Sequence, residues 1–189
     1  MQKKFSQLYC FISEFNYLDL SNLDKNIHII YRNYKKNIDI STLILIRNYC
    51  KKNKKKFFLS NNVNLAIKYQ LDGVYIPAFN NQINFIKYLL PRNFKILGSA
   101  HNNFEISIKK KQGCNIIFLS PIFEVMKKNY FLDVIKFNLL TLNKKIKFVA
   151  LGGITEKNMS RLNLLTICGF AGISYFQKKT ASQGGRLNS

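Results

Sequence analysis

Short runs of apolar, β-branched and aromatic residues alternate along the chain with longer stretches in which apolar residues recur at helical spacing. Most of the short runs are continuously apolar, which is typical of strands buried on both faces of a parallel sheet. Eight such runs occur, at residues 8–13, 27–32, 57–60, 73–76, 95–99, 115–120, 147–151 and 170–174. We predict a strand at each of them.

The segments between these runs have helical character. Asn62 is a good capping residue at the start of one helix, Pro91 ends another, and Gly113 is a natural C-terminal cap for a third. Residues 16–25 are too short and polar a segment to assign. The predicted helices span residues 41–52, 62–70, 81–90, 102–112, 133–142 and 156–166.

Strict alternation of eight strands with helices predicts the α/β class and a trimmed (β/α)8 TIM barrel in a single domain. An open, doubly wound sheet is the alternative, but no Gly-rich GxGxxG turn follows any predicted strand. We assign residues 1–177 to the barrel. Residues 178–189 lose all periodicity and are predicted to be a flexible tail.

Composition narrows the class of protein further. A chain of 189 residues that is 47% hydrophobic has ample material for a folded core, which excludes disorder. No apolar run reaches the length of a membrane span, and the first residues make a poor signal peptide. The four cysteines are far apart and lack metal-ligand spacing, so we expect buried thiols in a reducing compartment. We therefore expect a soluble cytoplasmic protein with no membrane partner.

The charge is strongly unbalanced, with 30 Lys and Arg against 9 Asp and Glu and a net charge of +21. A non-specific nucleic-acid-binding protein is therefore an alternative of a different class, supported by the block KKNKKK at residues 51–56 and by ten tyrosines. The block is also typical of the solvated C-terminal end of a helix. Because the lysines are dispersed and no RNA- or DNA-binding signature occurs, we expect no specific nucleic-acid partner.

Glycine turns follow the last two predicted strands, where barrels often bind phosphate. Gly152 and Gly153 lead into a helix, and Ile173 and Ser174 end the final strand in a second small-residue turn. Free backbone amides there would attract a phosphate, although a tight turn without a ligand is the alternative. We expect Gly153→Asp to abolish ligand binding with little effect on folding.

An ordered series of motifs resembles the thiamine phosphate synthase/TenI family, in a divergent bacterial branch. The likeness extends in register from the first predicted strand to the last. Its segments are LSNNVNLA at 59–66, LDGVYI at 71–76, NIIFLSPIF at 115–123, VALGGIT at 149–155 and GFAGIS at 169–174, with YRNY at 31–34 and SAHN at 99–102 as further matches.

The resemblance implies a (β/α)8 barrel that joins a pyrimidine methyl diphosphate to a thiazole phosphate, so that phosphorylated thiamine precursors are the partners. It also implies Mg²⁺, but the family's metal-binding aspartates fall on Asn61 and near Asn80, with Ser60 beside the first. Neutral amides are weak Mg²⁺ ligands, so we assign no metal-binding residue. The family's two threonines near residues 125–128 are absent, but Lys127 and Lys128 supply cations.

Two hypotheses follow. In the first, the chain is a synthase in which Arg32, Lys127 and Lys128 bind the leaving diphosphate. In the second, it is a TenI-like thiazole tautomerase or a non-catalytic phosphate-ligand binder.

The histidines and tyrosines have competing interpretations. His101 is a candidate for proton transfer or, alternatively, a cap for the following helix, whereas His28 is expected to be buried with one hydrogen bond. Tyr31, Tyr34 and Tyr75 are expected more often in the core than stacked on a pyrimidine. The full set of candidate site residues is His101, Arg32, Lys127, Lys128, Ser60, Asn61, Asn80, Gly152, Gly153, Ile173 and Ser174.

Overall fold

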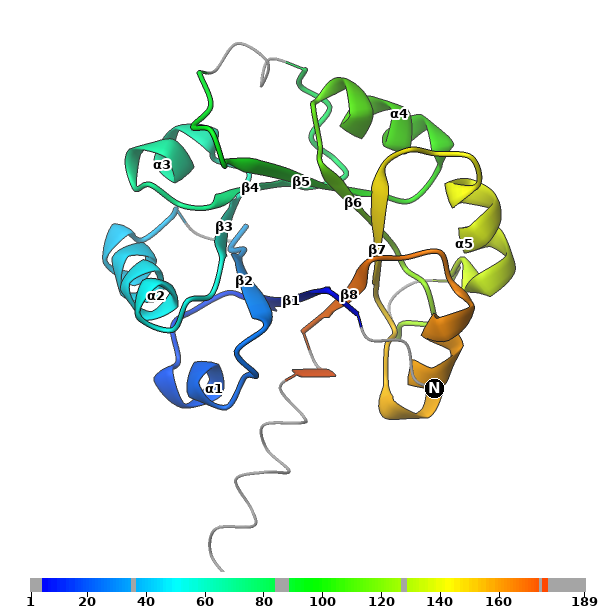
Figure 1. The fold of residues 1–189 in the computed structure, drawn as a ribbon, viewed down its shortest axis with the longest axis horizontal. Coiled ribbons are helices and arrows are strands. Elements are labelled where there is room, and N and C mark those ends of the chain that lie inside the picture. Colours follow the sequence, from blue (N-terminus) through cyan, green and yellow to red (C-terminus); the bar gives the residue numbers. More distant parts are fainter. Residues whose placement is uncertain (1–4, 35–36, 84–88, 127–128, 174, 177–189) are drawn as a thin grey trace, which may run out of the picture.

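Eight parallel strands close into a barrel surrounded by helices (Figure 1). The computed structural model describes residues 5–34, 37–83, 89–126, 129–173 and 175–176. The strands are β1 (Gln7–Ile12), β2 (Ile27–Tyr31), β3 (Phe57–Ser60), β4 (Gly73–Ile76), β5 (Lys95–Ala100), β6 (Ile116–Leu119), β7 (Lys147–Leu151) and β8 (Gly169–Gly172). Each pairs in parallel with its neighbours in sequence, and β1 closes the barrel by pairing with β8. The predicted (β/α)8 barrel is confirmed.

The helices differ from the prediction in a few places. They are α1 (Tyr17–Ser21), α2 (Ile40–Lys52), α3 (Val63–Lys68), α4 (Asn103–Lys111), α5 (Asp133–Thr141) and the 3₁₀ helix η2 (Glu156–Leu164). Helix α1 lies in the segment left unassigned, and Asn16 caps it by accepting from the amides of Leu18 and Asp19. The helix expected at 81–90 has no helical residue at 81–83 or 89–90, and residues 84–88 lie outside the described residues.

Side chains fill the barrel, so that it has a packed core and no pore. Because side chains alternate along a strand, Tyr9 and Phe11 of β1 point inward while Cys10 between them packs outward. The ring of Phe118 meets Tyr9 edge-on at 4.9 Å and Tyr75 at 5.5 Å between centroids. The complete inner cluster is Tyr9, Phe11, Ile30, Phe58, Tyr75, Leu97, Phe118, Val149 and Ala171.

A second apolar layer lies between the strands and the helices, and it takes up most of the cysteines. Cys10, Cys50 and Cys114 are buried, Cys168 is half-buried, and all four are free thiols. Burial raises the pKa of the Cys10 thiol to about 12, so it stays protonated and unreactive. The expectation of thiols packed as small hydrophobes is confirmed. Within the described ranges, no helix is long and apolar enough to cross a membrane.

Candidate active site at the carboxyl ends of the strands

Arg32 follows β2 and lies among aromatic rings. Its guanidinium sits 4.7 Å from the centroid of Phe11 and 5.7 Å from that of Tyr34. Tyr34 packs edge-on against Phe79 at 5.4 Å and shares a 3.1 Å hydrogen bond with Ser60 Oγ at the end of β3. This arrangement places one cation beside exposed aromatic surface, which suits a ligand that carries both an anion and a flat ring.

Asn61 and Asn80, which follow β3 and β4, are bonded to each other. Asn80 Nδ2 donates to Asn61 Oδ1 over 2.6 Å, and the Asn61 backbone amide donates to Tyr75 O. Asn61 has a φ of +60°, a conformation that Asn tolerates better than most residues. The amide oxygen of Asn61 is thus already occupied by a donor. Two neutral amides joined in this way do not fit Mg²⁺, which prefers carboxylate oxygens.

The loop that carries Asn80 is held by a buried lysine that the sequence pattern did not reveal. Lys109 of α4 is fully buried, and its Nζ donates to Pro77 O, Asn80 O and Gln112 Oε1, at 2.8, 2.8 and 2.9 Å. Gln112 Nε2 also donates to Asn80 O. Burial lowers the pKa of the Lys109 ammonium to about 8. Lysine at a helix end usually extends into solvent, so only the tertiary contacts could identify this one.

His101 follows β5 and is oriented by a carboxylate of the next helix. Its Nδ1 lies 2.8 Å from Glu105 Oε2, and its backbone amide donates to the same oxygen over 2.7 Å. Asn102, and not His101, caps α4 by accepting from the Glu105 amide. The helix-capping alternative for His101 is therefore wrong. A histidine fixed by a carboxylate has the arrangement used for proton transfer.

The other histidine and the tyrosines lie largely where the sequence placed them. His28 is half-buried, and its Nδ1 accepts from the Lys56 amide at 3.4 Å. Tyr31 and Tyr75 are core residues, whereas Tyr34 is half exposed. Of these rings, Tyr34 alone is both exposed and next to Arg32.

The glycine pair after β7 makes a close turn against the loop after β6. Gly152 and Gly153 have φ angles of +92° and +72°. A Cβ on Gly153 would lie 2.5 Å from the carbonyl oxygens of Phe123 and Glu124. Gly153→Asp would therefore disturb folding as well as binding, so the expectation that folding would tolerate it is wrong.

The backbone amides of this turn are the next feature of the candidate site. Asn158 of η2 donates to Gly153 O over 2.8 Å and so fixes the turn. Within the described residues, the amides of Gly153 and Ile154 donate no hydrogen bond. Two amides without acceptors before a helix are the chemistry that an oxyanion requires.

A cavity of about 180 Å³ lies where β1, β2 and β8 end next to α1. Arg32 and Ile173 both line it, so the structure brings these two predicted residues together. Glu14 and Asp19 also line it, and the sequence pattern did not single them out. The glycine pair is not part of its lining, and its amides form a separate feature. Lys127, Lys128 and Ser174 lie outside the described residues, so their predicted roles stay predictions.

The fold and these strand-end residues define a (β/α)8 barrel with its candidate site at the carboxyl ends of the strands. The thiamine monophosphate synthase family model matches residues 28–176, and the chain belongs to this family. The family uses Mg²⁺. Within the described ranges, no group of three or more His, Cys, Asp or Glu side chains could hold a metal ion.

Known proteins agree with this assignment. A thiamine-phosphate synthase of Prochlorococcus marinus subsp. pastoris is 32% identical over 142 residues, which cover 72% of this chain and 40% of that protein. One from Lactococcus lactis is 22% identical, covering 77% of this chain and 68% of that protein. The chain thus spans about two fifths of the length of the first of these relatives.

A solved structure supports the fold. The thiamine phosphate pyrophosphorylase from Pyrococcus furiosus superposes with a TM-score of 0.71 at 19% identity, covering 97% of this chain and 98% of that chain.

Proposed function

We propose that the protein is a thiamine phosphate synthase-like transferase that joins a hydroxymethylpyrimidine diphosphate to a thiazole phosphate. The observation that carries this proposal is the family match, which extends from β2 to the residues after β8. The strand-end residues agree with it, because they offer a cation, aromatic surface and free amides to two phosphorylated, flat ligands.

The reaction needs charge stabilisation and positioning more than proton transfer. The bond between the pyrimidine methylene carbon and the diphosphate oxygen breaks, and the diphosphate leaves with the electron pair. The thiazole nitrogen then donates its lone pair to the carbon and closes the new C–N bond. Arg32, with Lys127 and Lys128, is proposed to stabilise the departing charge.

The remaining candidates are proposed to position the thiazole phosphate and the pyrimidine ring. The amides of the Gly152–Gly153 turn, with Ile173 and Ser174, are proposed to hold the thiazole phosphate. Tyr34 and Phe79 offer ring edges and faces to the pyrimidine, and Ser60 fixes Tyr34 by their shared hydrogen bond. Binding both substrates in one geometry accounts for much of the rate enhancement.

Mg²⁺ supplies charge neutralisation of diphosphate in this chemistry. The bonded pair of Asn61 and Asn80 does not suit the ion, so we propose that turnover by this chain depends only weakly on Mg²⁺.

The same pair favours a second candidate function, a TenI-like thiazole tautomerase or a phosphate-ligand binder. A tautomerase needs a group that moves a proton and no metal-assisted departure of diphosphate. His101 oriented by Glu105 fits that requirement.

Growth rescue of a thiamine-requiring bacterial strain that lacks its synthase tests the proposal. We expect rescue by the wild-type chain and by Arg92→Ala, which removes an exposed arginine before β5. Arg32→Ala should fail to rescue, and its kcat/KM in a purified assay should fall about 100-fold. A folded, well-expressed wild-type chain that does not rescue growth would favour the tautomerase or the binding role.

The assay of the purified protein tests the role of the metal. We expect activity to change little between millimolar Mg²⁺ and excess chelator. A steep Mg²⁺ requirement would show that Asn61 and Asn80 are not at the metal-binding positions.

The proposed location is the cytoplasm, a reducing compartment that agrees with four free thiols.

A further inference from the structure

The opposite end of the barrel, where the strands begin, has a broad basic hollow. Its volume is about 610 Å³. Its apolar lining includes Phe58 and Leu97, which are buried members of the inner cluster. The rim carries five exposed lysines and no acidic residue: Lys56, Lys95, Lys110, Lys145 and Lys147.

The direction of the helices accounts for part of the positive charge at this end. Each helix follows the carboxyl end of one strand and runs back to the start of the next, so its last turn lies at the end where strands begin. Cations are favoured in that turn by the helix dipole. The exposed lysines of last turns are Lys51 and Lys52 in α2, Lys68 in α3, and Lys110 and Lys111 in α4.

Acidic residues collect at the other end for the same reason. Asp19, Glu105, Asp133 and Glu156 all lie in first turns of helices. Within the described residues, the ion pairs are His101–Glu105 and Asp133–Arg161, and neither contains a lysine. Within the described residues, no rim lysine therefore forms an ion pair with a carboxylate.

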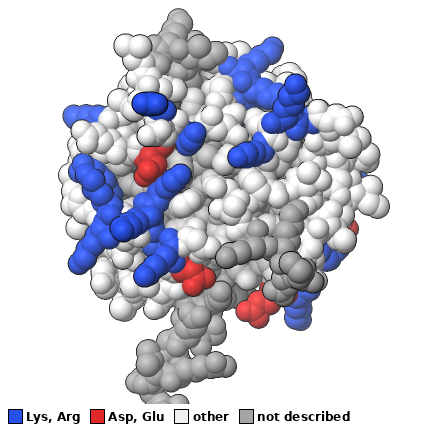
Figure 2. Space-filling view, in the orientation of Figure 1, with Lys and Arg blue, Asp and Glu red and all other residues white. Residues whose placement is uncertain are grey.

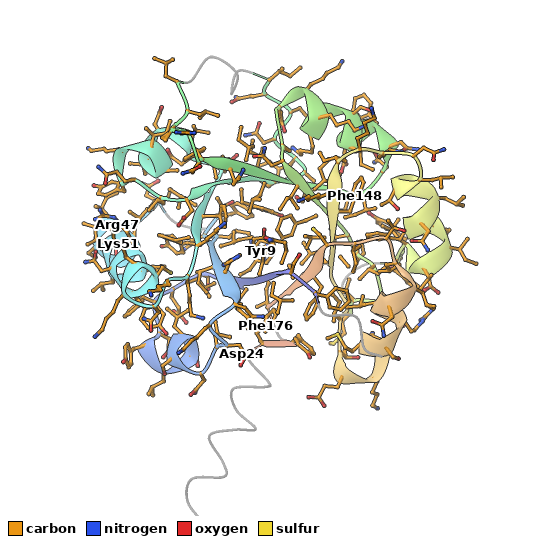
Figure 3. The ribbon with its side chains drawn as sticks, viewed as in Figure 1. Tyr9, Asp24, Arg47, Lys51, Phe148 and Phe176 are labelled. Atoms are coloured by element: carbon orange, nitrogen blue, oxygen red, sulfur yellow. The ribbon has the colours of Figure 1, made fainter. Side chains whose placement is uncertain are left out.

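The basic surface extends beyond the central hollow. A neighbouring hollow of about 360 Å³ shares Lys56 and adds Arg47, Lys51 and Lys54. Another, of about 540 Å³, shares Lys145 and adds Lys144. Figure 2 shows a face of the molecule on which blue side chains dominate over red ones, and Figure 3 labels Arg47, Lys51 and Asp24 in the same view.

One carboxylate lies on this surface, and one of the lysines in the basic block is buried and does not contribute to it. The carboxylate of Asp72 borders the 360 Å³ hollow and accepts from the Phe57 amide. Lys55 is buried, and its Nζ donates to the backbone oxygens of Leu23 and Asp24, so it is a structural residue. The exposed lysines around both hollows remain accessible to an anion.

We propose that the N-terminal face of the barrel binds the phosphodiester backbone of single-stranded nucleic acid without sequence preference. The surface is extended and its cations are exposed, so one long polyanion can release counterions along its whole length. Tyr9 and Phe58 in the hollow are about 1% exposed and offer no face for base stacking. A flat bilayer fits a concave surface less well, since the apolar side chains lie at the bottom of the hollow.

Fluorescence anisotropy with a labelled 20-nucleotide oligouridylate tests the proposal. If about five lysines contact phosphates, affinity should fall roughly 100-fold between 50 and 200 mM KCl. The quadruple variant Lys56→Gln, Lys95→Gln, Lys145→Gln, Lys147→Gln should bind at least 10-fold more weakly at 50 mM KCl, with a smaller salt dependence and an unchanged circular dichroism spectrum.

A matched pair of double variants separates this surface from the net charge. Lys145→Gln with Lys147→Gln should weaken binding several-fold. Lys136→Gln with Lys157→Gln, in the first turns of α5 and η2, removes the same charge from the opposite end and should leave binding within about two-fold. Equal losses in the two doubles would overturn the proposal.

Three other results would also overturn it. They are a more than 10-fold preference among homopolymers, displacement of the oligonucleotide by millimolar pyrophosphate, and binding to vesicles of 30% phosphatidylglycerol without binding to oligouridylate. Synthase activity of the quadruple variant should equal that of the wild type. The nucleic-acid and transferase proposals can therefore fail independently.

Discussion

The same eight strands form both ends of the barrel. The two ends differ in the kind of side chain they present and in how their loops are held. At the carboxyl end, short loops are fixed by specific bonds, such as Asn80 to Asn61, His101 to Glu105 and Asn158 to Gly153. At the amino end, exposed lysines surround a hollow without ion pairs to the described carboxylates. Fixed contacts suit a site that positions small substrates, whereas mobile charges suit a partner held by electrostatics.

Glycines at the two ends give the sharpest test of this contrast. Gly153 at the carboxyl end and Gly113 before β6 have nearly equal φ angles, +72° and +74°. A Cβ on Gly153 would lie 2.5 Å from two backbone oxygens, but on Gly113 its nearest neighbour would be Ile96 Cδ1 at 3.8 Å. We expect Gly153→Ala to lower the free energy of unfolding by about 4 kcal/mol, and Gly113→Ala by about 1 kcal/mol.

Urea denaturation of both alanine variants measures the difference, because the backbone cost is common to the two. Equal losses of stability would show that the loop after β6 does not press on the glycine turn.

Lys109 and Lys110 are neighbours in α4 with opposite roles. Lys109 is buried against the loop that carries Asn80, whereas Lys110 is exposed on the rim of the basic hollow. Lys109→Met would leave Pro77 O and Gln112 Oε1 without their donor, and we expect it to cost about 2–3 kcal/mol in the free energy of unfolding. Lys110→Met should stay within about 0.5 kcal/mol of the wild type.

Chemical denaturation tests this pair, and activity adds a second measurement. Because Lys109 positions the Asn80 loop, its variant should also lose activity, while Lys110→Met keeps it. A stable and active Lys109→Met would contradict the positioning role.

The smallest expected effect is the contribution of His28, at the amino end, to the pH dependence of stability. Burial lowers its pKa to about 4, and its Nδ1 accepts a hydrogen bond from the Lys56 amide. Between pH 6.5 and 4 the unfolded chain takes up this proton more readily than the folded chain, so stability falls as the pH is lowered through that range. We expect this histidine to contribute roughly 1–2 kcal/mol to the fall, reduced by its partial exposure.

Thermal unfolding of His28→Gln between pH 4 and 7 checks the expectation. Glutamine keeps an acceptor for the Lys56 amide but does not titrate, so the variant should lose less stability on acidification than the wild type. An identical pH dependence would show that the imidazole takes its proton with equal ease in both states.

Pattern and local chemistry predicted the strands well, because each strand is a continuous apolar run between polar segments. The ends of some strands differ from the prediction by one or two residues: the strand predicted at 170–174 spans Gly169–Gly172, and the one predicted at 8–13 spans Gln7–Ile12. The segment at 156–166 has helical spacing but forms a 3₁₀ helix, a distinction that apolar periodicity does not make. Helix α1 was missed because its five residues are too few for a periodic signal.

By itself, the sequence determined the eight-strand alternation, the glycine turns after the last two strands and the shortage of carboxylates, since each is a local property of composition or spacing. Only the tertiary structure decided which distant residues meet. In the folded chain Asn80 donates a hydrogen bond to Asn61, and Lys109 is buried beneath the Pro77 loop. Lysines from separate strands, loops and helices surround one hollow. Such contacts depend on how the barrel closes, and closure brings together groups whose separation along the chain carries no local signal.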